Sequence, residues 1–334
     1  MKRASGLYEM IADYDNIVLA FVKASRGKKG KSEVIDFYKN LEKNIYCLKN
    51  QFETGNFDLG HYYFFKINDP KPRNICASSF PERVIHHAVM NICEPFFDSF
   101  SISSSYACRK KKGMHKAVYD ARKKSLRYPW FLKLDIKKYF DSIDHQILKD
   151  LILKKFKDKK LIHLFYSIIN SFNSDIGKGI PIGNLLSQYF ANYYLGFFDH
   201  FIKDEKRIKG YLRYMDDFII FGDKKAFLKD ILEETRIFLS DNLKLDLKDN
   251  IILNRSIKGI PFLGLNIFPH KTILSPPAKK RFVKKFKKYE HNYKTGLWTE
   301  FELIRHIEPL IGFTLVSDCR NFRNDIIKKY GVIF

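Results

Sequence analysis

A short run near the middle of the chain, Tyr-Met-Asp-Asp at 214–217, constrains the fold more than any other segment. Apolar residues flank its two adjacent carboxylates, and glycines at 210 and 222 bound it, which is typical of a β-hairpin with acids at its tip. Adjacent carboxylates at a tight turn repel each other unless a cation lies with them. Hard divalent ions prefer oxygen ligands, and Mg²⁺ is the usual one in phosphate chemistry. We therefore expect a metal site here, completed by Asp135 from another apolar segment.

The charge of the chain points to a polyanionic partner. Its 334 residues include 60 Lys and Arg against 37 Asp and Glu, a formal net charge of +23, and 45% are hydrophobic, enough for two or three folded subdomains. Nucleic acid and an anionic membrane are the polyanions to consider. No apolar run reaches the length of a membrane span and no signal-type core follows Met1, so we favour nucleic acid. The five scattered cysteines form no Cys-x-x-Cys pair, which indicates reduced cytosolic thiols.

Apolar periodicity and turn residues divide the chain into short elements. Residues 129–135 are predicted to form a buried strand that ends at Asp135, and residues 210–222 the hairpin. Pro81 is a good first-turn residue for an apolar helix over 81–99. The other expected elements are helices over 1–50, 145–173, 186–201 and 224–240, a strand over 61–68, a loop at 179–183 and a strand pair over 259–268.

The chain changes character after Ser275. The next predicted helix carries seven basic residues between 279 and 288, while aromatic residues at 282, 286, 289 and 293 share one face. A second helix is expected to begin at Thr299, because Thr299 and Glu302 have the spacing of a capping box. The tail from 276 is thus predicted to be a small, basic, helical subdomain.

Three carboxylates from two strands suit two-metal phosphoryl transfer. Such sites hold two ions about 4 Å apart, which contact the attacking and leaving oxygens. Asp135, Asp216 and Asp217 fit this chemistry if their strands are neighbours. The competing interpretation is a solvated acidic turn, since a four-residue motif arises readily by chance. The second acid at a strand end and the high basic charge disfavour that interpretation.

Six motifs, in order along the chain, resemble those of bacterial reverse transcriptases. They are Lys-Pro-Arg at 71–73, Pro-Glu-Arg-Val-Ile at 81–85, Tyr-Ala-Cys-Arg at 106–109, Phe-Leu-Lys-Leu-Asp-Ile-Lys-Lys-Tyr-Phe-Asp-Ser-Ile-Asp-His at 131–145, Tyr-Met-Asp-Asp at 214–217 and Phe-Leu-Gly at 262–264. The resemblance spans nearly the whole chain and implies an α+β right-hand polymerase fold. It implies fingers with the first palm elements over 1–125, a palm with an antiparallel sheet over 126–270 that contains a helical fingers insertion near 146–180, and a basic helical thumb over 271–334.

By this resemblance the protein is an RNA-directed DNA polymerase that uses two Mg²⁺ ions. Asp135, Asp216 and Asp217 would be its catalytic carboxylates and metal ligands. Asp135 and Asp216 would be the main ligands, with help from the backbone carbonyl of Ile136.

Other residues of the first catalytic motif have competing explanations. Phe140 matches an aromatic steric gate that excludes a 2′-hydroxyl, although from the residue alone a core phenylalanine would be preferred. Asp141 and Asp144 are better explained as turn and cap residues. No general acid for pyrophosphate is assigned, because Ile251 occupies the position where many relatives have lysine and Lys248 matches poorly.

The resemblance also assigns residues to the nucleotide and the nucleic acid. Lys71 and Arg73 would bind the incoming triphosphate, since Arg offers a planar fork and Lys a point charge, with solvated surface residues as the alternative. Ile182, Gly183 and Gln188 would also lie at the nucleotide. Template and primer contacts are assigned to Arg83, Arg109, Tyr214, Met215, Leu263, Gly264, Lys280 and Lys284.

The loop before the palm helix narrows the resemblance. Most reverse transcriptases have Gln-Gly and then Ser-Pro there, whereas residues 182–188 are Ile-Gly-Asn-Leu-Leu-Ser-Gln, a pattern similar to the reverse transcriptases of diversity-generating retroelements. Loss of the glutamine removes a polar side chain beside the templating pair, which should lower discrimination against wrong pairs. Members of that group are bacterial or phage-encoded, copy a template RNA with errors mostly opposite adenines, and act with a small accessory variability protein.

The expected partners are therefore template RNA, the RNA/cDNA duplex, dNTPs and that accessory protein in a cytoplasmic ribonucleoprotein, with no membrane. Two alternatives stay open: a retron-like or defence-associated reverse transcriptase, and a non-catalytic RNA-binding protein on the same fold. The intact Asp135, Asp216 and Asp217 disfavour the second, because clustered acids without metal would weaken RNA binding.

Overall fold

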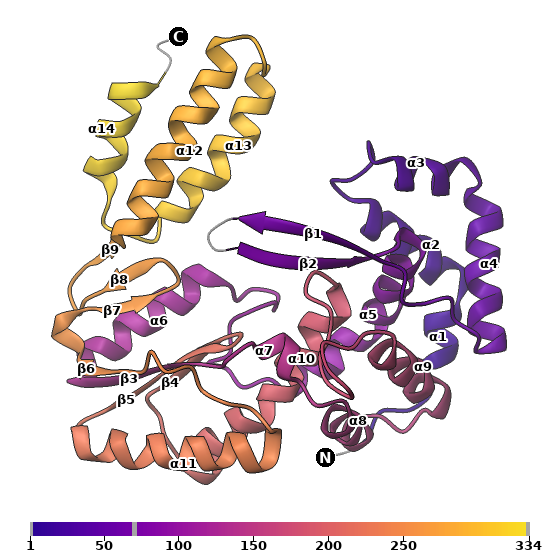
Figure 1. Ribbon diagram of the computed structural model, residues 1–334, viewed down its shortest axis with the longest axis horizontal. Coiled ribbons are helices and arrows are strands. Elements are labelled where there is room, and N and C mark those ends of the chain that lie inside the picture. Colours follow the sequence, from indigo (N-terminus) through magenta and orange to yellow (C-terminus); the bar gives the residue numbers. More distant parts are fainter. Residues whose placement is uncertain (1–2, 69–71, 332–334) are drawn as a thin grey trace. The chain divides into compact units, whose positions relative to one another are not determined.

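The computed structural model describes residues 3–68 and 72–331, drawn as ribbons in Figure 1. The chain forms two compact units, each built from three stretches of sequence, and each is described by itself. The first unit comprises Met1–Ser103, Ile136–Arg207 and Glu234–Lys248; the second comprises Ser104–Asp135, Ile208–Glu233 and Asp249–Phe334. Helix α11, Lys225–Leu243, is shared between them.

The first unit is mainly helical and is organised around α5, Phe80–Phe100. Helices α1, α2, α3 and α10 pack on α5, whose buried side chains include Val84, Ala88 and Cys93. Asp13, Asp144 and Asp158 cap α2, α8 and α9 by accepting backbone N–H bonds in their first turns. The helices, in chain order, are α1 Tyr8–Ala12, α2 Tyr14–Ser25, α3 Ser32–Lys39, α4 Leu41–Thr54, α5, α7 Tyr139–Ser142, α8 His145–Lys155, α9 Lys159–Asn170, α10 Leu185–His200 and the π-helical turn η1 Phe201–Glu205.

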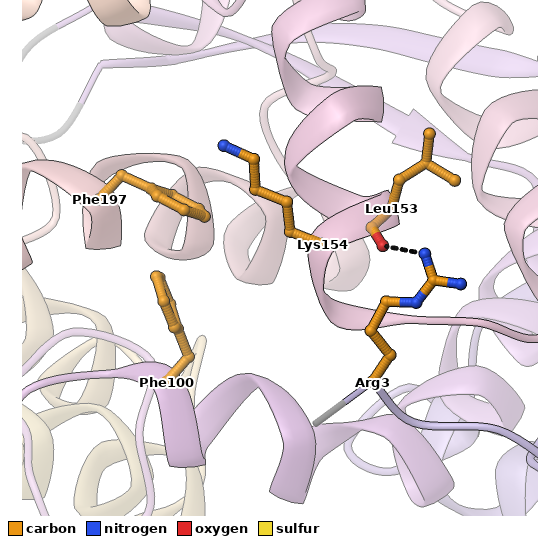
Figure 2. Close-up of a pocket in the computed structure, with 5 residues that line it drawn as sticks. All are labelled: Arg3, Phe100, Leu153, Lys154 and Phe197. Carbon is orange, nitrogen blue, oxygen red and sulfur yellow. Dashed lines mark hydrogen bonds between the residues drawn. The ribbon is translucent and has the colours of Figure 1, made fainter. Parts of the chain in front are cut away.

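An antiparallel hairpin belongs to this unit, with most of β1 and the first half of β2 exposed and the end of β2 buried. Strand β1, Tyr62–Asn68, pairs with β2, Pro72–Ser78, from Tyr62 opposite Ser78 to Asn68 opposite Pro72. The strand predicted over 61–68 is confirmed, whereas Lys71 lies outside the described residues. Elsewhere in the unit, α8, α10 and the end of α5 border a pocket that Arg3 also lines (Figure 2).

The second unit contains a four-stranded antiparallel sheet. Its strand order is β4 (Tyr211–Tyr214), β5 (Asp217–Gly222), β3 (Trp130–Asp135) and β6 (Ile252–Arg255). Helix α6, Met114–Arg127, packs on β4 and contributes the small buried residues Ala117, Val118 and Ala121 to a core that also holds Phe131 and Ile219. The predicted strand over 129–135 and hairpin over 210–222 are both confirmed.

A smaller sheet and three helices complete the second unit. Strands β7 (Ile260–Phe262), β8 (Leu265–Ile267) and β9 (Thr272–Leu274) form an antiparallel meander, which confirms the strand pair predicted over 259–268. Helix α12, Pro276–Lys294, packs on α13, Glu300–Thr314, and on α14, Arg320–Tyr330 (Figure 1). The capping box of Thr299 and Glu302 is present. No helix within 3–68 and 72–331 is long and apolar enough to cross a membrane.

Candidate active site

The register of the central sheet brings the predicted acids together. Asp135, the last residue of β3, lies directly opposite Asp217, the first residue of β5. Tyr214 pairs with Asp217 across the hairpin, so Met215 and Asp216 form the turn between them. Met215 has φ +58°, a left-handed conformation that costs a non-glycine residue energy and is kept only where its surroundings hold it. The structure thus places the three carboxylates at one end of the sheet.

The same alternation that builds the core also selects which face carries the acids. Successive side chains of a strand point to opposite faces, so Phe131, Lys133 and Asp135 share one face of β3. Phe131 belongs to the buried core of this unit, whereas Lys133 and Asp135 are only half-buried. On β5, Asp217 likewise lies on the face of Ile219, which belongs to the same core. The acids therefore lie at the open end of a face that is apolar apart from Lys133.

Lys133 is the cation at this end of the sheet. Its ammonium Nζ forms an ion pair with Oδ1 of Asp217 at 2.8 Å, and the two side chains are only 14% and 21% exposed. Burial raises the pKa of Asp217 to about 6; the Lys133 charge opposes this rise, and the charges of Asp135 and Asp216 add to it. The ammonium therefore offsets the negative charge of the acids only in part, and a further cation near them would be electrostatically favourable.

The donor set fits a hard divalent cation. Carboxylate oxygens of Asp135 and Asp216, with the backbone carbonyl of Ile136, are the ligand types that Mg²⁺ accepts. The pKa of Asp217 is raised mainly by burial and further by the charges of Asp135 and Asp216, and a bound cation would offset both effects. Among residues 3–68 and 72–331, no group of three or more His, Cys, Asp or Glu side chains is already arranged around an ion position. Asp217 is turned to Lys133 instead, so the assignment of two Mg²⁺ ions stays a prediction.

Arg213 supports the acidic turn and was not predicted from the sequence. Its side chain is fully buried, and Nη1 donates to the backbone carbonyl of Met215 at 3.0 Å. Its backbone N–H donates to Ser104 at 2.9 Å, and its carbonyl accepts from Tyr106 at 3.0 Å, so residues 104–106 flank β4. Arg109, predicted near the template, donates from Nη1 to the carbonyl of Ser105 at 2.9 Å in the same segment. Both Lys133 and Arg213 are charged residues inside apolar strands. A charged residue is unusual at such a position, and this is the feature by which the sequence could have identified them.

The remaining template and primer candidates of this unit lie in two places, the β7–β8 turn and helix α12. Leu263 and Gly264 form the tight β7–β8 turn, with φ +50° and +81°, and Gly264 accepts a backbone bond from Ser275 at 3.0 Å. Lys280 and Lys284 are exposed on α12. An exposed basic helix face is suited to phosphates, and the roles of these four residues stay predictions.

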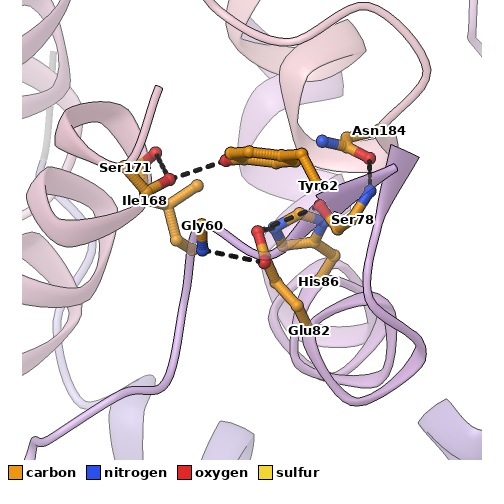
Figure 3. Close-up of polar contacts among 8 residues, drawn as sticks. All are labelled: Gly60, Tyr62, Ser78, Glu82, His86, Ile168, Ser171 and Asn184. Carbon is orange, nitrogen blue, oxygen red and sulfur yellow. Dashed lines mark hydrogen bonds and ion pairs between the residues drawn. The ribbon is translucent and has the colours of Figure 1, made fainter. Parts of the chain in front are cut away.

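In the first unit, the loop that carries Ile182 and Gly183 is fastened to β2 (Figure 3). The N–H of Cys76 donates to the carbonyl of Ile182 at 2.8 Å, and the N–H of Ser78 donates to Oδ1 of Asn184 at 3.0 Å. Gly183 has φ +122°, and a Cβ there would lie 2.7 Å from Cγ2 of Ile75. The loop is therefore bonded to β2 at two points, and the backbone conformation and close packing at Gly183 favour glycine there.

A buried carboxylate lies beneath this junction. Glu82, with no exposed surface, accepts from the Ser78 hydroxyl at 3.0 Å and from the Gly60 N–H at 3.1 Å, with Nε2 of His86 at 3.6 Å (Figure 3). Burial raises the pKa of Glu82, and burial lowers that of His86 to about 3. The network joins the start of α5, the end of β2 and the segment before β1. From the motif at 81–85 the sequence predicts a role for Arg83, in template and primer contacts, and does not identify Glu82.

The other candidates of the first unit are placed as follows. Arg83 forms an ion pair with Glu33 and lies over the Phe80 ring at 5.4 Å, while Arg73 is exposed on β2. Phe140 is half-buried beside Tyr139, and Gln188 lies in the first turn of α10.

Asp144 is a helix cap, as the sequence favoured. Its carboxylate accepts from the Ile147 N–H at 3.0 Å and pairs with Lys244 at 2.8 Å. Asp141 is exposed in the short helix α7. Neither aspartate therefore requires a catalytic explanation.

Known proteins resemble the chain in both sequence and fold. The family model described as reverse transcriptase (RNA-dependent DNA polymerase) matches residues 66–267. Protein YkfC of Escherichia coli is 24% identical over 271 residues, 67% of this chain and 71% of YkfC. The group II intron-encoded protein LtrA of Lactococcus lactis is 26% identical over 274 residues, 61% of this chain, which spans 46% of LtrA.

The fold itself has a solved counterpart. Apo telomerase from Candida tropicalis matches with a TM-score of 0.51 and 13% identity, over 87% of this chain and 64% of the telomerase chain. At that identity the likeness concerns the fold alone, and it confirms the predicted α+β polymerase fold. Because the family model covers more than half of the chain, including β3, β4 and β5 with their acids, the chain belongs to the reverse transcriptase family of RNA-dependent DNA polymerases.

Proposed function

We propose that the protein copies a template RNA into DNA at Asp135, Asp216 and Asp217, and that it does so with errors concentrated opposite template adenines. The single observation that carries the catalytic part is the register of Asp135 opposite Asp217, next to the turn that holds Asp216. The family supplies the reaction, nucleotidyl transfer from dNTPs on an RNA template.

The residues of this chain would divide the work as follows. Asp135 and Asp216 would be the main ligands of Mg²⁺ together with the carbonyl of Ile136, and Asp217, paired with Lys133 in the metal-free structure, would add the third carboxylate. Bound Mg²⁺ would supply charge stabilisation for phosphoryl transfer. Arg213, through the Met215 carbonyl, would keep the turn in the conformation that presents Asp216. These are positioning and charge roles, which is what phosphoryl transfer chiefly requires of a protein.

The error-prone part rests on the loop at 182–188. Ile182 presents an aliphatic side chain where most reverse transcriptases have glutamine. Its backbone carbonyl accepts from the Cys76 N–H, and two residues later the Asn184 side chain accepts from the Ser78 N–H. A site with fewer polar groups rejects a mismatched pair less strongly, because no buried polar group is left unpaired by the mismatch. Diversity-generating retroelement enzymes share this loop pattern, so a small accessory variability protein in a ribonucleoprotein belongs to the same proposal.

Primer extension on RNA with Mg²⁺ and dNTPs, followed by deep sequencing of the cDNA, tests both parts. Asp216→Ala is expected to lower the rate by at least about 100-fold, the scale of losing one main electrostatic group at such a centre. Asp249→Ala, which removes an exposed acid of the same unit, is the matched control.

The error spectrum then decides the type of enzyme. Substitutions concentrated opposite adenines support the proposal, and Ile182→Gln should reduce them. Errors spread evenly would instead favour a retron-like, defence-associated or intron-type enzyme. No synthesis even with cognate RNA and accessory protein would favour the non-catalytic RNA-binding alternative.

A further inference from the structure

The pocket in the first unit has a composition that the polymerase chemistry does not use. Arg3, Phe100, Leu153, Lys154 and Phe197 line it, and its volume is about 570 Å³ (Figure 2). That volume lies within the range of sites for small organic ligands. None of the five residues is among those assigned to catalysis, nucleotide, template or primer.

One side of the pocket is an aromatic wall held by packing. The rings of Phe100 and Phe197 lie 4.7 Å apart between centroids at an interplanar angle of 44°. Phe100 is seated against α10 at Gly196, where a Cβ would come within 2.7 Å of its ring. Leu153, 38% exposed, supplies the apolar surface on the far side (Figure 2). A flat, weakly polar group could rest against these side chains at little entropic cost, because their positions are already set.

The rim of the pocket is cationic. Lys154 places its ammonium 5.5 Å from the centroid of the Phe197 ring. The backbone beside Arg3 is bonded to the end of α8: the Ala4 N–H donates to the carbonyl of Lys155 at 2.9 Å, and the Ala4 carbonyl accepts from the N–H of Lys157 at 2.7 Å. Arg3 itself donates from Nη1 to the Leu153 carbonyl at 3.4 Å, one of its five N–H donors. None of the described residues that line the pocket is acidic, so an anionic group is favoured here.

We propose that this pocket binds one nucleotide of a single-stranded RNA, with the base against Phe100, Phe197 and Leu153 and the phosphate at Arg3 and Lys154. Aromatic surface beside Arg and Lys is the combination by which proteins hold single-stranded nucleic acid without reading its sequence. Arginine matches phosphate geometry with its fork, and lysine adds a point charge. RNA is favoured as the source of the nucleotide because the chain belongs to a family that works on RNA. The pocket would therefore anchor RNA independently of catalysis.

The test uses the full chain and a fluorescent RNA of about 12 nucleotides that contains 4-thiouridine, a length within the usual span of single-strand sites. Anisotropy gives the Kd, and photocrosslinks are mapped by mass spectrometry. Lys154→Glu is compared with Lys159→Glu, which makes the same charge change at an exposed lysine of α9 outside the pocket. Phe197→Leu keeps the charge and an apolar side chain, so it separates stacking from electrostatics. Uridine monophosphate alone is the competitor.

Phe197→Leu is expected to weaken binding about 5- to 10-fold, the lower end of what losing one base–aromatic stack does. Lys154→Glu is expected to weaken binding by a similar factor, because it replaces a phosphate-binding cation with an anion. Lys159→Glu should change Kd no more than about twofold, the effect of one screened surface charge. Crosslinks at Phe100, Lys154 or Phe197 that these two variants lose would support the site.

Two results would count against it. If uridine monophosphate competes as effectively as the RNA itself, the pocket is a site for a free nucleotide, and the proposal that it binds RNA is overturned. Kd values for all three variants that equal the wild-type Kd, with no crosslink in the pocket, would overturn the site altogether. Because binding is measured without synthesis, either result is distinct from failure of the polymerase proposal.

Discussion

Replacing Asp217 by asparagine should stabilise the metal-free protein while it disables the enzyme. The pKa of this carboxyl is about 6 in the fold, against 3.8 for an exposed aspartate. The folded state therefore holds a proton between pH 4 and 6 that the unfolded state has released, so stability falls as pH rises through this window. At pH 7 the full difference corresponds to about 3 kcal/mol that ionised Asp217 costs the fold.

Asp217→Asn removes that cost. The pKa of about 6 already includes the favourable charge of Lys133, whose ammonium lies 2.8 Å from Asp217, so loss of this ion pair is not a further cost. The net expectation is a gain of up to about 3 kcal/mol in the free energy of unfolding at pH 7. At pH 5, where Asp217 is mostly protonated already, the gain should shrink by about 1 kcal/mol.

Urea unfolding in EDTA at the two pH values, followed by circular dichroism, measures this difference. Asp249→Asn, which neutralises an exposed acid of the same unit, is the control and should change stability by no more than about 0.5 kcal/mol. Adding Mg²⁺ at about ten times its Kd should stabilise the wild type by about 1.4 kcal/mol and the variant by less. A variant less stable than the wild type in EDTA at pH 7, with an unchanged control, would refute the account of these acids as a strained, cation-seeking cluster.

Three further predictions follow from the first unit. Asn184→Ala should cost about 1–3 kcal/mol of stability in the same urea assay by leaving the buried N–H of Ser78 without an acceptor, and an unchanged free energy of unfolding would contradict this. Burial and the nearby cations lower the pKa of His87 to about 4, so the unfolded state takes up a proton first as pH falls below 6.5; His87→Gln should reduce the loss of stability between pH 7 and 5 by about 1–2 kcal/mol, and an unchanged pH profile would contradict this. Gly183→Ala should raise the KM for dNTPs several-fold, because φ +122° and the approach to Ile75 both oppose a Cβ, whereas the same change at exposed Gly30, where a Cβ meets nothing, should leave KM unaltered.

The parts of the fold that the sequence predicts are those in which local chemistry and the global structure agree. Apolar residues on both sides of the acids and bounding glycines identify β4 and β5, and the approach of Asp135 to the hairpin follows once β3 is seen to end, and β5 to begin, at an acid. The capping box at Thr299 is likewise a purely local device.

Helix α6 shows why other parts are missed. Its buried side is made of the small residues Ala117, Val118, Ala121 and Ser125 among many basic ones, so the segment as a whole resembles polar surface although these residues share one helix face. Packing on β4 buries that face. The four-residue strand β6 is set by its partner β3 and not by its own pattern. Lys133 as partner of Asp217, and Glu82 as the centre of a buried network, depend on neighbours that are remote in sequence. The boundaries of fingers, palm and thumb stay predictions.

The position of the acids has a general physical reason. A sheet face that is apolar over most of its length excludes water from its end, and charges placed there are poorly solvated. Asp135 and Asp217 occupy such an end, beyond Phe131 and Ile219, and Lys133 offsets only part of their charge. The poor solvation that raises the pKa of Asp217 is also what would make a bound cation strongly favourable. An apolar residue at Asp217 would therefore stabilise the sheet and lower its affinity for metal. Asp217→Asn tests this opposition between stability and metal binding best, because it removes the charge and keeps a polar side chain of the same size.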